Sequence, residues 1–342
     1  MANQSDIQPD AEIARLRQLI MGFRTTQAVH AAAKLGLADL LSQKPMTAAE
    51  LAVQVSAHPR ALYRLLRALA SLGIFSEGSG GVFAMTPAAE LLRRDSPNSL
   101  RSTAVFYGEE FIWRAFGGLT GAVETGRTAF RDTHHLSFYE YLEQHPRAAA
   151  LFHEMMTGFS ALEASSILAA YDFSIARVIV DIGGGQGGMA AALLARYDQA
   201  RAIIFDAAPP TDTTRRSLQE TGVANRIKFK QGDFFKAVPA DGDLYMLKSI
   251  IHNWDDASSV AILTNCARAM APDGRILIAD RLIPEGNAAS EAKLFDLNMM
   301  VTAGGEERTE AEYAALLTAS GLRLTRVVPT SSYMSLIEAR KS

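Results

Sequence analysis

The sequence feature that most constrains this chain is a glycine-rich run, DIGGGQGG, at residues 181–188. It follows RVIV at 177–180, a β-branched apolar run typical of a buried parallel strand, and precedes MAAALLA at 189–195, a strong helix former. The order predicts a strand, a tight turn and a helix. Glycine lets such a turn adopt positive φ and lets the backbone approach a ligand closely. The helix N-terminus then presents unpaired N–H groups to that ligand.

Two cofactor classes fit this run. Gly183-x-Gly185-x-x-Gly188 is the fingerprint of dinucleotide-binding folds and predicts NAD. Asp181-x-Gly183-x-Gly185-x-Gly187 is the acid-led pattern typical of S-adenosylmethionine (SAM) binding. A turn that binds no ligand is the third interpretation, because small residues also let a helix pack closely on a sheet.

The composition is that of an ordinary globular protein. Of 342 residues, 48% are hydrophobic and 21% are charged, and the net charge of -3 does not favour nucleic acid as the main partner. The length favours about two domains. The single cysteine, Cys266, excludes an intramolecular disulfide and a thiolate zinc site. Because no apolar segment follows Met1 and no run of about 18 apolar residues occurs, we expect a cytoplasmic protein without a signal peptide or membrane span.

The first hundred residues predict helices and one β-hairpin. Apolar residues at steps of three and four predict helices between positions 11 and 41, and TAAE at 47–50 is a capping box that opens another. Pro59 begins a further helix, and two short apolar segments around the GSGG turn at 78–81 predict a hairpin. Helices followed by a hairpin make a winged helix.

A winged helix raises the hypothesis of a DNA-binding regulator whose second helix enters the major groove. Arg60, Arg64 and Arg67 share one face of that helix. Between positions 45 and 94, however, there are five arginines, three glutamates and no lysine. Because phosphate binding needs many cationic contacts, an internal or dimer-forming role is the favoured interpretation.

Residues 100–171 have a helical pattern rich in aromatic residues and methionine. Each such side chain alone is typical of a helix core, but as a group before the glycine run they suit a pocket for a flat apolar ligand. Methionine adapts to a flat ring, which favours an aromatic or polyketide-like substrate. The predicted pocket wall consists of Phe111, Trp113, Met155, Met156, Phe159, Asn298, Met299 and Met300.

After residue 177, strand and helix signals alternate, which predicts an α/β domain built on a parallel sheet. The candidate strands are 177–181, 202–206, 227–231, 244–248, 274–280, 322–328 and 333–339. A short PTSS segment separates the last two, so we expect an antiparallel hairpin that closes the sheet.

Residues that follow the strands lie at the ligand-binding edge of such a sheet. Asp181, Asp206 and Asp233 all occupy such positions. Asp206 lies 18 residues after Gly188, which suits a ribose hydroxyl in either cofactor class. Asp233 with Phe234 suits adenine, whose amino group donates a hydrogen bond and whose faces stack. For both acids a helix cap is the alternative role.

The chemically most informative strand end is KSIIHNWDD at 248–256. His252 is the one histidine that follows a predicted strand on the ligand side, so we predict a general base there. Asp280, at the end of the next strand, and Glu307, in a polar loop, could approach it. A carboxylate bonded to one ring nitrogen fixes the tautomer and leaves the other nitrogen free to accept a proton.

Five motifs in order make the chain similar to the SAM-dependent O-methyltransferases of the plant caffeate and isoflavone type and of the bacterial antibiotic and pigment tailoring type. The motifs are DIGGGQG at 181–187, FD at 205–206, GDFF at 232–235, KSIIHNWDD at 248–256 and GGEERT at 304–309. The resemblance covers nearly the whole chain. It implies a mostly helical winged-helix dimerisation domain over 1–98, a helical linker contributing to the substrate pocket over 99–172, and a Rossmann-like seven-stranded SAM-binding methyltransferase domain over 173–342.

The resemblance also implies a function, which is metal-independent methyl transfer from SAM to a hydroxyl of a small aromatic or polyketide-like secondary metabolite, with S-adenosylhomocysteine (SAH) as product. It implies His252 as the catalytic base, flanked by Asp280 and Glu307. The implied cofactor-binding residues are Asp181, Gly183, Gly185, Asp206, Gly232, Asp233, Phe234 and Lys248. It further implies a homodimer through the N-terminal domain, without nucleic acid or membrane partners.

The chain departs from many plant relatives at three positions, which have Glu at Asp280, Met at Phe234 and Asp at Asn253. Because Asp280 is one methylene shorter and Asn253 lacks a negative charge, we expect His252 to depend more on Glu307. Two alternative functions stay open. One is an NAD-dependent dehydrogenase that uses the dinucleotide fingerprint, and the other is a winged-helix regulator that senses SAM.

Overall fold

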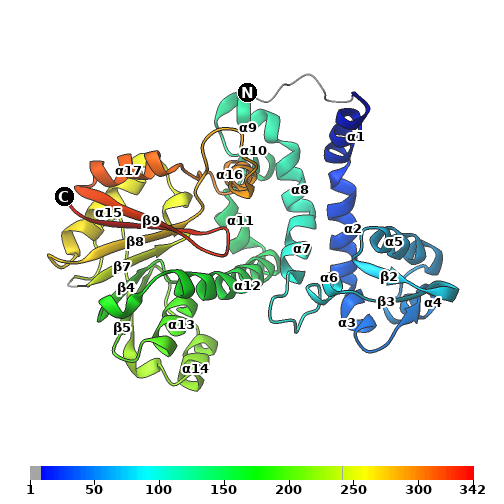
Figure 1. The fold of residues 1–342 in the computed structure, drawn as a ribbon, viewed down its shortest axis with the longest axis horizontal. Coiled ribbons are helices and arrows are strands. Elements are labelled where there is room, and N and C mark those ends of the chain that lie inside the picture. Colours follow the sequence, from blue (N-terminus) through cyan, green and yellow to red (C-terminus); the bar gives the residue numbers. More distant parts are fainter. Residues whose placement is uncertain (1–8, 241) are drawn as a thin grey trace. The chain divides into compact units, whose positions relative to one another are not determined.

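A computed structural model gives the fold and describes residues 9–240 and 242–342. Contacts divide the chain into two compact units, both drawn in Figure 1. The first comprises the chain up to Arg114 together with Leu142–Gly158, and the second comprises Ala115–Tyr141 and Phe159–Ser342. The segment 99–172, which the resemblance implies as a linker, is therefore shared between the two units.

The first unit is helical apart from a small three-stranded sheet. Its elements are α1 (Pro9–Ile20), α2 (Gly22–Leu35), α3 (Leu37–Leu41), β1 (Met46–Thr47), α4 (Ala48–Gln54), α5 (Pro59–Ser71), β2 (Phe75–Glu77), β3 (Val82–Met85), α6 (Pro87–Glu90) and α7 (Arg101–Gly108). Three helices cross the boundary between the units, namely α8 (Glu110–Gly117), α11 (Phe138–Gln144) and α12 (Pro146–Ala170).

The predicted winged helix is confirmed. Thr47 and Glu50 form the expected capping box at the start of α4, and Pro59 stands in the first turn of α5. The hairpin β2–β3 is extended by β1, which the sequence did not predict, in the antiparallel order β1-β3-β2. Leu51, Leu66 and Phe83 are fully buried where the helices pack on this sheet.

The second unit contains the large sheet. Its elements are α9 (Leu119–Thr125), α10 (Ala129–His134), β4 (Val178–Ile182), α13 (Gly188–Arg196), β5 (Arg201–Asp206), α14 (Asp212–Glu220), β6 (Ile227–Gln231), β7 (Leu244–Lys248), α15 (Asp256–Ala269), β8 (Arg275–Asp280), α16 (Glu291–Val301), α17 (Glu310–Ala319), β9 (Leu322–Pro329) and β10 (Ser335–Lys341). Within the described ranges, no helix combines the length and apolar character needed to span a bilayer.

The sheet has seven strands in the order β6-β5-β4-β7-β8-β10-β9. Strands β4 to β8 pair in parallel, and the hairpin β9–β10 joins them through an antiparallel pairing of β10 with β8. The predicted Rossmann-like fold class is therefore confirmed. The strand order reverses between β4 and β7, and ligands of such folds bind at that reversal, beyond the carboxyl ends of the strands.

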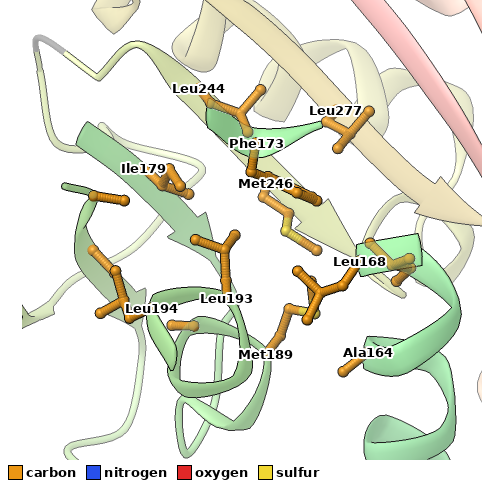
Figure 2. Close-up of a cluster of buried hydrophobic side chains, with 14 of the residues drawn as sticks. Ala164, Leu168, Phe173, Ile179, Met189, Leu193, Leu194, Leu244, Met246 and Leu277 are labelled. Carbon is orange, nitrogen blue, oxygen red and sulfur yellow. The ribbon is translucent and has the colours of Figure 1, made fainter. Parts of the chain in front are cut away.

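Alternate residues of each strand point to opposite faces of the sheet. Because both sets are apolar, each face has its own buried cluster, and helices cover both faces. On β7, Leu244 and Met246 belong to one buried cluster, whereas Tyr245 and Leu247 belong to another. The first cluster packs under α12 and α13, and Figure 2 shows Leu168 of α12 gathered with the side chains of these elements. The second cluster packs under α15 and α17. Two apolar cores thus fix the strand ends that carry the site.

Candidate active site

The glycine turn between β4 and α13 has the geometry of the acid-led pattern. Gly183, Gly185 and Gly187 have φ of 67°, 53° and 79°, in the region where side chains other than glycine are strained. Gly188 is instead the first residue of α13, with no positive φ and with nothing within 4 Å of an added Cβ, so close packing does not require glycine there either. The residues that require glycine are therefore those of the SAM-type pattern, while the last position of the dinucleotide fingerprint has no such requirement.

Asp206, at the end of β5, is hydrogen-bonded to this turn. Its carboxylate accepts hydrogen bonds from the N–H of Gly185 at 2.9 Å and of Ala208 at 3.1 Å. The following helix, α14, is capped by Thr211, so the alternative role of Asp206 as a helix cap is wrong. A carboxylate oxygen accepts more than one hydrogen bond, which leaves Asp206 able to accept from a ribose hydroxyl. Its ribose role stays a prediction.

An aromatic group lies beyond β6, where adenine is predicted to bind. Phe234 and Phe235 both contact Trp254, with ring centroids 5.9 and 4.9 Å away. Asp233 accepts the N–H of Phe235 at 2.9 Å and so shapes the turn that presents these rings. Gly232 leaves no room for a Cβ, which would lie 2.5 Å from the ring of Phe205. The turn therefore holds flat apolar surface beside a carboxylate.

Lys248 ends β7, next to the glycine turn of β4. Its ammonium group lies 2.9 Å from the carboxylate of Glu163 and donates to the hydroxyl of Ser160 at 3.3 Å, both on α12. The side chains of Lys248 and Glu163 are 11% and 4% exposed, so this is a buried ion pair. The sequence placed Lys248 here by resemblance but gave no role to Glu163.

His252 is bonded to Glu307, 55 residues further along the chain. The histidine lies on a short 3-10 helix just after β7, and its Nδ1 is 2.8 Å from Oε1 of Glu307. Both residues are buried. An ionised carboxylate only accepts hydrogen bonds, so Nδ1 carries the proton and Nε2 is left to accept one. This is the arrangement that a general base requires.

Further contacts fix the loop that carries Glu307. The N–H of Glu307 donates to Asp296 of α16 at 2.8 Å, and the N–H of Glu306 donates to the carbonyl of His252 at 2.9 Å. The buried guanidinium of Arg308 bonds carbonyl oxygens on either side of the same turn. The GGEERT loop is thus held to the histidine turn by a backbone hydrogen bond and by the Arg308 side chain, in addition to the His252–Glu307 pair.

Asp280 is fully buried at the end of β8, but its bonded partner is a residue that the sequence did not indicate. Tyr313 of α17 donates to Oδ2 of Asp280 at 2.9 Å, while Oδ1 has no hydrogen-bond partner among the described residues. Arg281 was also missed. Its guanidinium carbon lies 3.7 Å from the ring centroid of Phe295, and its Nη1 lies 3.9 Å from Oε1 of Glu307. The histidine is therefore surrounded by two carboxylates and one guanidinium.

The pKa values of both His252 and Asp280 are raised, for different reasons. Burial lowers the pKa of His252, but Asp280 and Glu307 together outweigh burial and raise the pKa above its ordinary value, against the opposing charge of Arg281. Burial raises the pKa of Asp280 to about 6, and the nearby histidine opposes this rise. The imidazole is thus a stronger base than a free one.

We expect the pH profile of kcat/KM to report this raised pKa. The base works only when neutral, so activity should fall as the pH drops through a value above 6.5. Glu307→Gln keeps an acceptor for Nδ1 but removes a charge that raises the pKa, so the acidic limb should move to lower pH and the maximal rate should fall. The control is Glu306→Gln, at an exposed neighbour, which should leave the limb in place. A Glu307→Gln limb at or above the wild-type pH would contradict the assignment.

Ser249, between β7 and the histidine turn, has a φ of 56°. A left-handed conformation costs a residue other than glycine about 1–2 kcal/mol. Glycine avoids this cost, but its larger conformational entropy in the unfolded chain offsets part of the gain in stability. We expect Ser249→Gly to raise the free energy of unfolding by about 0.5–1 kcal/mol in urea denaturation. Ser249→Ala, which keeps the strain, should give no such gain, and a loss of stability with glycine would refute the reasoning.

The predicted pocket wall is divided between the units. Phe111, Trp113, Met155 and Met156 belong to the first unit, where Phe111 packs edge-on against Phe106. The second unit holds Phe159, Asn298, Met299 and Met300. Met299 is buried, and Oδ1 of Asn298 has no hydrogen-bond partner within the described part of the chain. Their contact with a substrate stays a prediction.

The fold and the site together define a class, namely an α/β protein with a glycine turn after its first parallel strand and a buried carboxylate–histidine pair at a neighbouring strand end. Comparison with known families gives the narrower assignment. Residues 116–323 match the O-methyltransferase domain, and residues 17–95 match the O-methyltransferase dimerisation domain. The chain belongs to this O-methyltransferase family.

Curated relatives and solved structures agree over nearly the full length. The phenazine O-methyltransferase PhzM of Lysobacter antibioticus is 42% identical, with 95% of each chain covered. The mitomycin biosynthesis 6-O-methyltransferase of Streptomyces lavendulae is 38% identical over 96% of this chain and 94% of that protein. The crystal structure of NcsB1, an O-methyltransferase from neocarzinostatin biosynthesis in complex with SAM and 2-hydroxy-5-methyl naphthoic acid, has a TM-score of 0.78 at 33% identity, covering 93% of this chain and 96% of that one.

Proposed function

We propose that this protein transfers the methyl group of SAM to a hydroxyl of a small aromatic or polyketide-like secondary metabolite, with His252 as general base. The observation that carries the proposal is the 2.8 Å bond between His252 and Glu307 at the end of the strand next to the glycine turn. The relatives support the class of acceptor, since two of those compared above are named for a phenazine and a mitomycin, and the third was solved in complex with a naphthoic acid.

The residues at the glycine turn fit SAM. Three glycines with positive φ keep Cβ atoms away from the ligand, and Asp206, at the end of β5, suits a ribose. Asp233 and the rings of Phe234 and Trp254 suit an adenine. Bound SAM supplies a methyl group on a positively charged sulfur, which a nucleophilic oxygen attacks in line.

The task of the protein is to place the acceptor and to remove its proton. Placing the reacting atoms in line can supply about 7–11 kcal/mol of the barrier. A phenol has a pKa near ~10 and a free imidazole near ~6.5, so the proton leaves as the oxygen attacks. Nε2 of His252 accepts it, and Glu307 stabilises the resulting imidazolium through Nδ1. The two buried carboxylates raise the pKa of His252 and so bring the proton affinity of the imidazole closer to that of the attacking oxygen.

Three finer assignments belong to the same proposal. We place the protein in the cytoplasm and expect it to work without a metal; among the described residues, no group of three or more His, Cys, Asp or Glu could hold one. We also propose a homodimer, because the dimerisation domain leaves Leu19, Ile20 and Phe23 at least half exposed. Light scattering should give twice the chain mass, and a monomer at micromolar concentration would refute the dimer.

Calorimetric titration tests the cofactor. SAM and SAH should bind, and NADH should not. Binding of NADH without SAM would revive the dehydrogenase alternative. Tight, salt-sensitive retardation of random DNA would instead favour a SAM-sensing regulator, because non-specific DNA binding depends on cationic contacts.

A further inference from the structure

A buried charge cluster lies beside the glycine turn, and the proposed chemistry at His252 does not use it. Lys248 and Glu163 form the ion pair described above, with 2.9 Å between nitrogen and oxygen. Glu163 is 3% exposed, and α12 presents it to the end of β7. Burying two charges is costly, so an internal pair is weak evidence of a stabilising role and calls for another explanation.

Asp181 adds a second carboxylate to this cluster. It is 3% exposed beneath the turn, where a Cβ on Gly184 would lie 2.6 Å from its Oδ2. That oxygen has no hydrogen-bond partner among the described residues. Burial raises the pKa of Asp181 to about 7, and the charge of Lys248 opposes the rise. A buried acceptor without a donor is unfavourable unless a ligand supplies one.

Two carboxylates and one ammonium group at one place match a specific chemistry. A free α-amino acid group carries an ammonium with three N–H donors and a carboxylate that only accepts. The ammonium suits Glu163 and Asp181, and the carboxylate suits Lys248. The cluster also adjoins the glycine turn that the proposed function assigns to the cofactor.

We propose that Glu163 is a cofactor-binding residue that, with Asp181, binds the α-ammonium group of the methionine moiety while Lys248 binds its carboxylate. This inference rests on the proposed function. Without the cofactor, Lys248 and Glu163 then pair with each other. When the cofactor binds, its carboxylate pairs with Lys248 and its ammonium group pairs with Glu163. The pair also holds the Glu163 side chain in place beside the site.

The test compares two ligands that differ only in the amino-acid end. SAH carries it, and 5′-methylthioadenosine keeps the adenosine and thioether but lacks it. Titration calorimetry should show that Glu163→Gln weakens SAH binding about 10- to 100-fold, the range expected for a charged hydrogen bond, and changes 5′-methylthioadenosine binding less than about twofold. Asp206→Ala should weaken both ligands alike. The matched control, Glu154→Gln on an exposed part of α12, should affect neither.

Glu163→Gln leaves Lys248 buried without its counter-ion, which can destabilise the fold. The double variant Glu163→Gln with Lys248→Met removes both charges, and it should bind 5′-methylthioadenosine normally and lose its preference for SAH. Wild-type preference for SAH in either variant would overturn the inference while leaving the proposed function intact. Failure of the wild-type protein to bind SAH would instead overturn the proposed function.

Discussion

Replacing His252 by Gln should lower kcat by about 100- to 10,000-fold, the contribution typical of a positioned general base. Glutamine donates to Glu307 through its amide, so the buried carboxylate keeps a partner, but it cannot accept the proton of the acceptor hydroxyl. SAH affinity should stay within a few-fold of wild type, because Asp206 and the glycine turn, which we assign to the cofactor, lie at the ends of other strands. Single-turnover kinetics with saturating SAM measures the chemical step.

His58→Ala, at an exposed histidine of the winged helix, is the matched control and should keep full activity. His252→Ala should lose at least as much activity as His252→Gln and should also be less stable, since it leaves Glu307 buried without its partner. Methyl transfer by His252→Gln within a few-fold of wild type would show that another group, or water, takes the proton.

Gly305→Ala should damage the site without touching any side chain in it. A Cβ at this position would overlap the carbonyl oxygen of His252 and lie 2.8 Å from Cα of Asn253. Both are backbone atoms, so neither can rotate away, and the GGEERT loop must shift. We expect the free energy of unfolding to fall by about 1–3 kcal/mol, as for an overpacked core, and kcat to fall about 100-fold, as for a misplacement of about 1 Å.

Urea denaturation and steady-state kinetics measure these two effects. Gly121→Ala is the matched control, because this glycine lies within α9 and a Cβ there would meet nothing within 4 Å. It should be neutral or slightly stabilising, since alanine is the better helix former. Wild-type activity in Gly305→Ala would mean that the tight fit of the loop against the histidine turn has no part in placing Glu307.

Much of this site follows from the order of strands in the sequence. Alternating strands and helices predict a parallel sheet, and parallel strands bring their carboxyl ends to one edge. This explains why Asp206 and His252 could be placed on the ligand side before the fold was known. The same reasoning leaves the glycine run ambiguous, because both fingerprints share Gly183 and Gly185. The structure favours the SAM-type pattern, since Gly187 has a positive φ, whereas Gly188 has neither a positive φ nor any atom within 4 Å of an added Cβ.

The residues that sequence reasoning missed are those whose role depends on tertiary contacts. Tyr313 fits the apolar periodicity of α17 and so resembles any core residue, although its hydroxyl bonds Asp280. Arg281 directly follows Asp280 and gives no signal of its ring contacts. Glu163 could have been found from the sequence, because a single acid in the otherwise uncharged helical stretch FSALEASSILAA predicts a buried charge with a functional role.

The central claim is methyl transfer to a hydroxyl oxygen at the His252 site. The most direct measurement incubates the protein with methyl-labelled SAM and a panel of phenols, hydroxylated polyketides and phenazines, and identifies the products by mass spectrometry and NMR. We predict a labelled O-methyl product from at least one hydroxylated aromatic compound, made by the wild-type protein and lost in His252→Gln. Label found only on nitrogen or carbon, or an O-methyl product formed equally well by His252→Gln, would contradict the account.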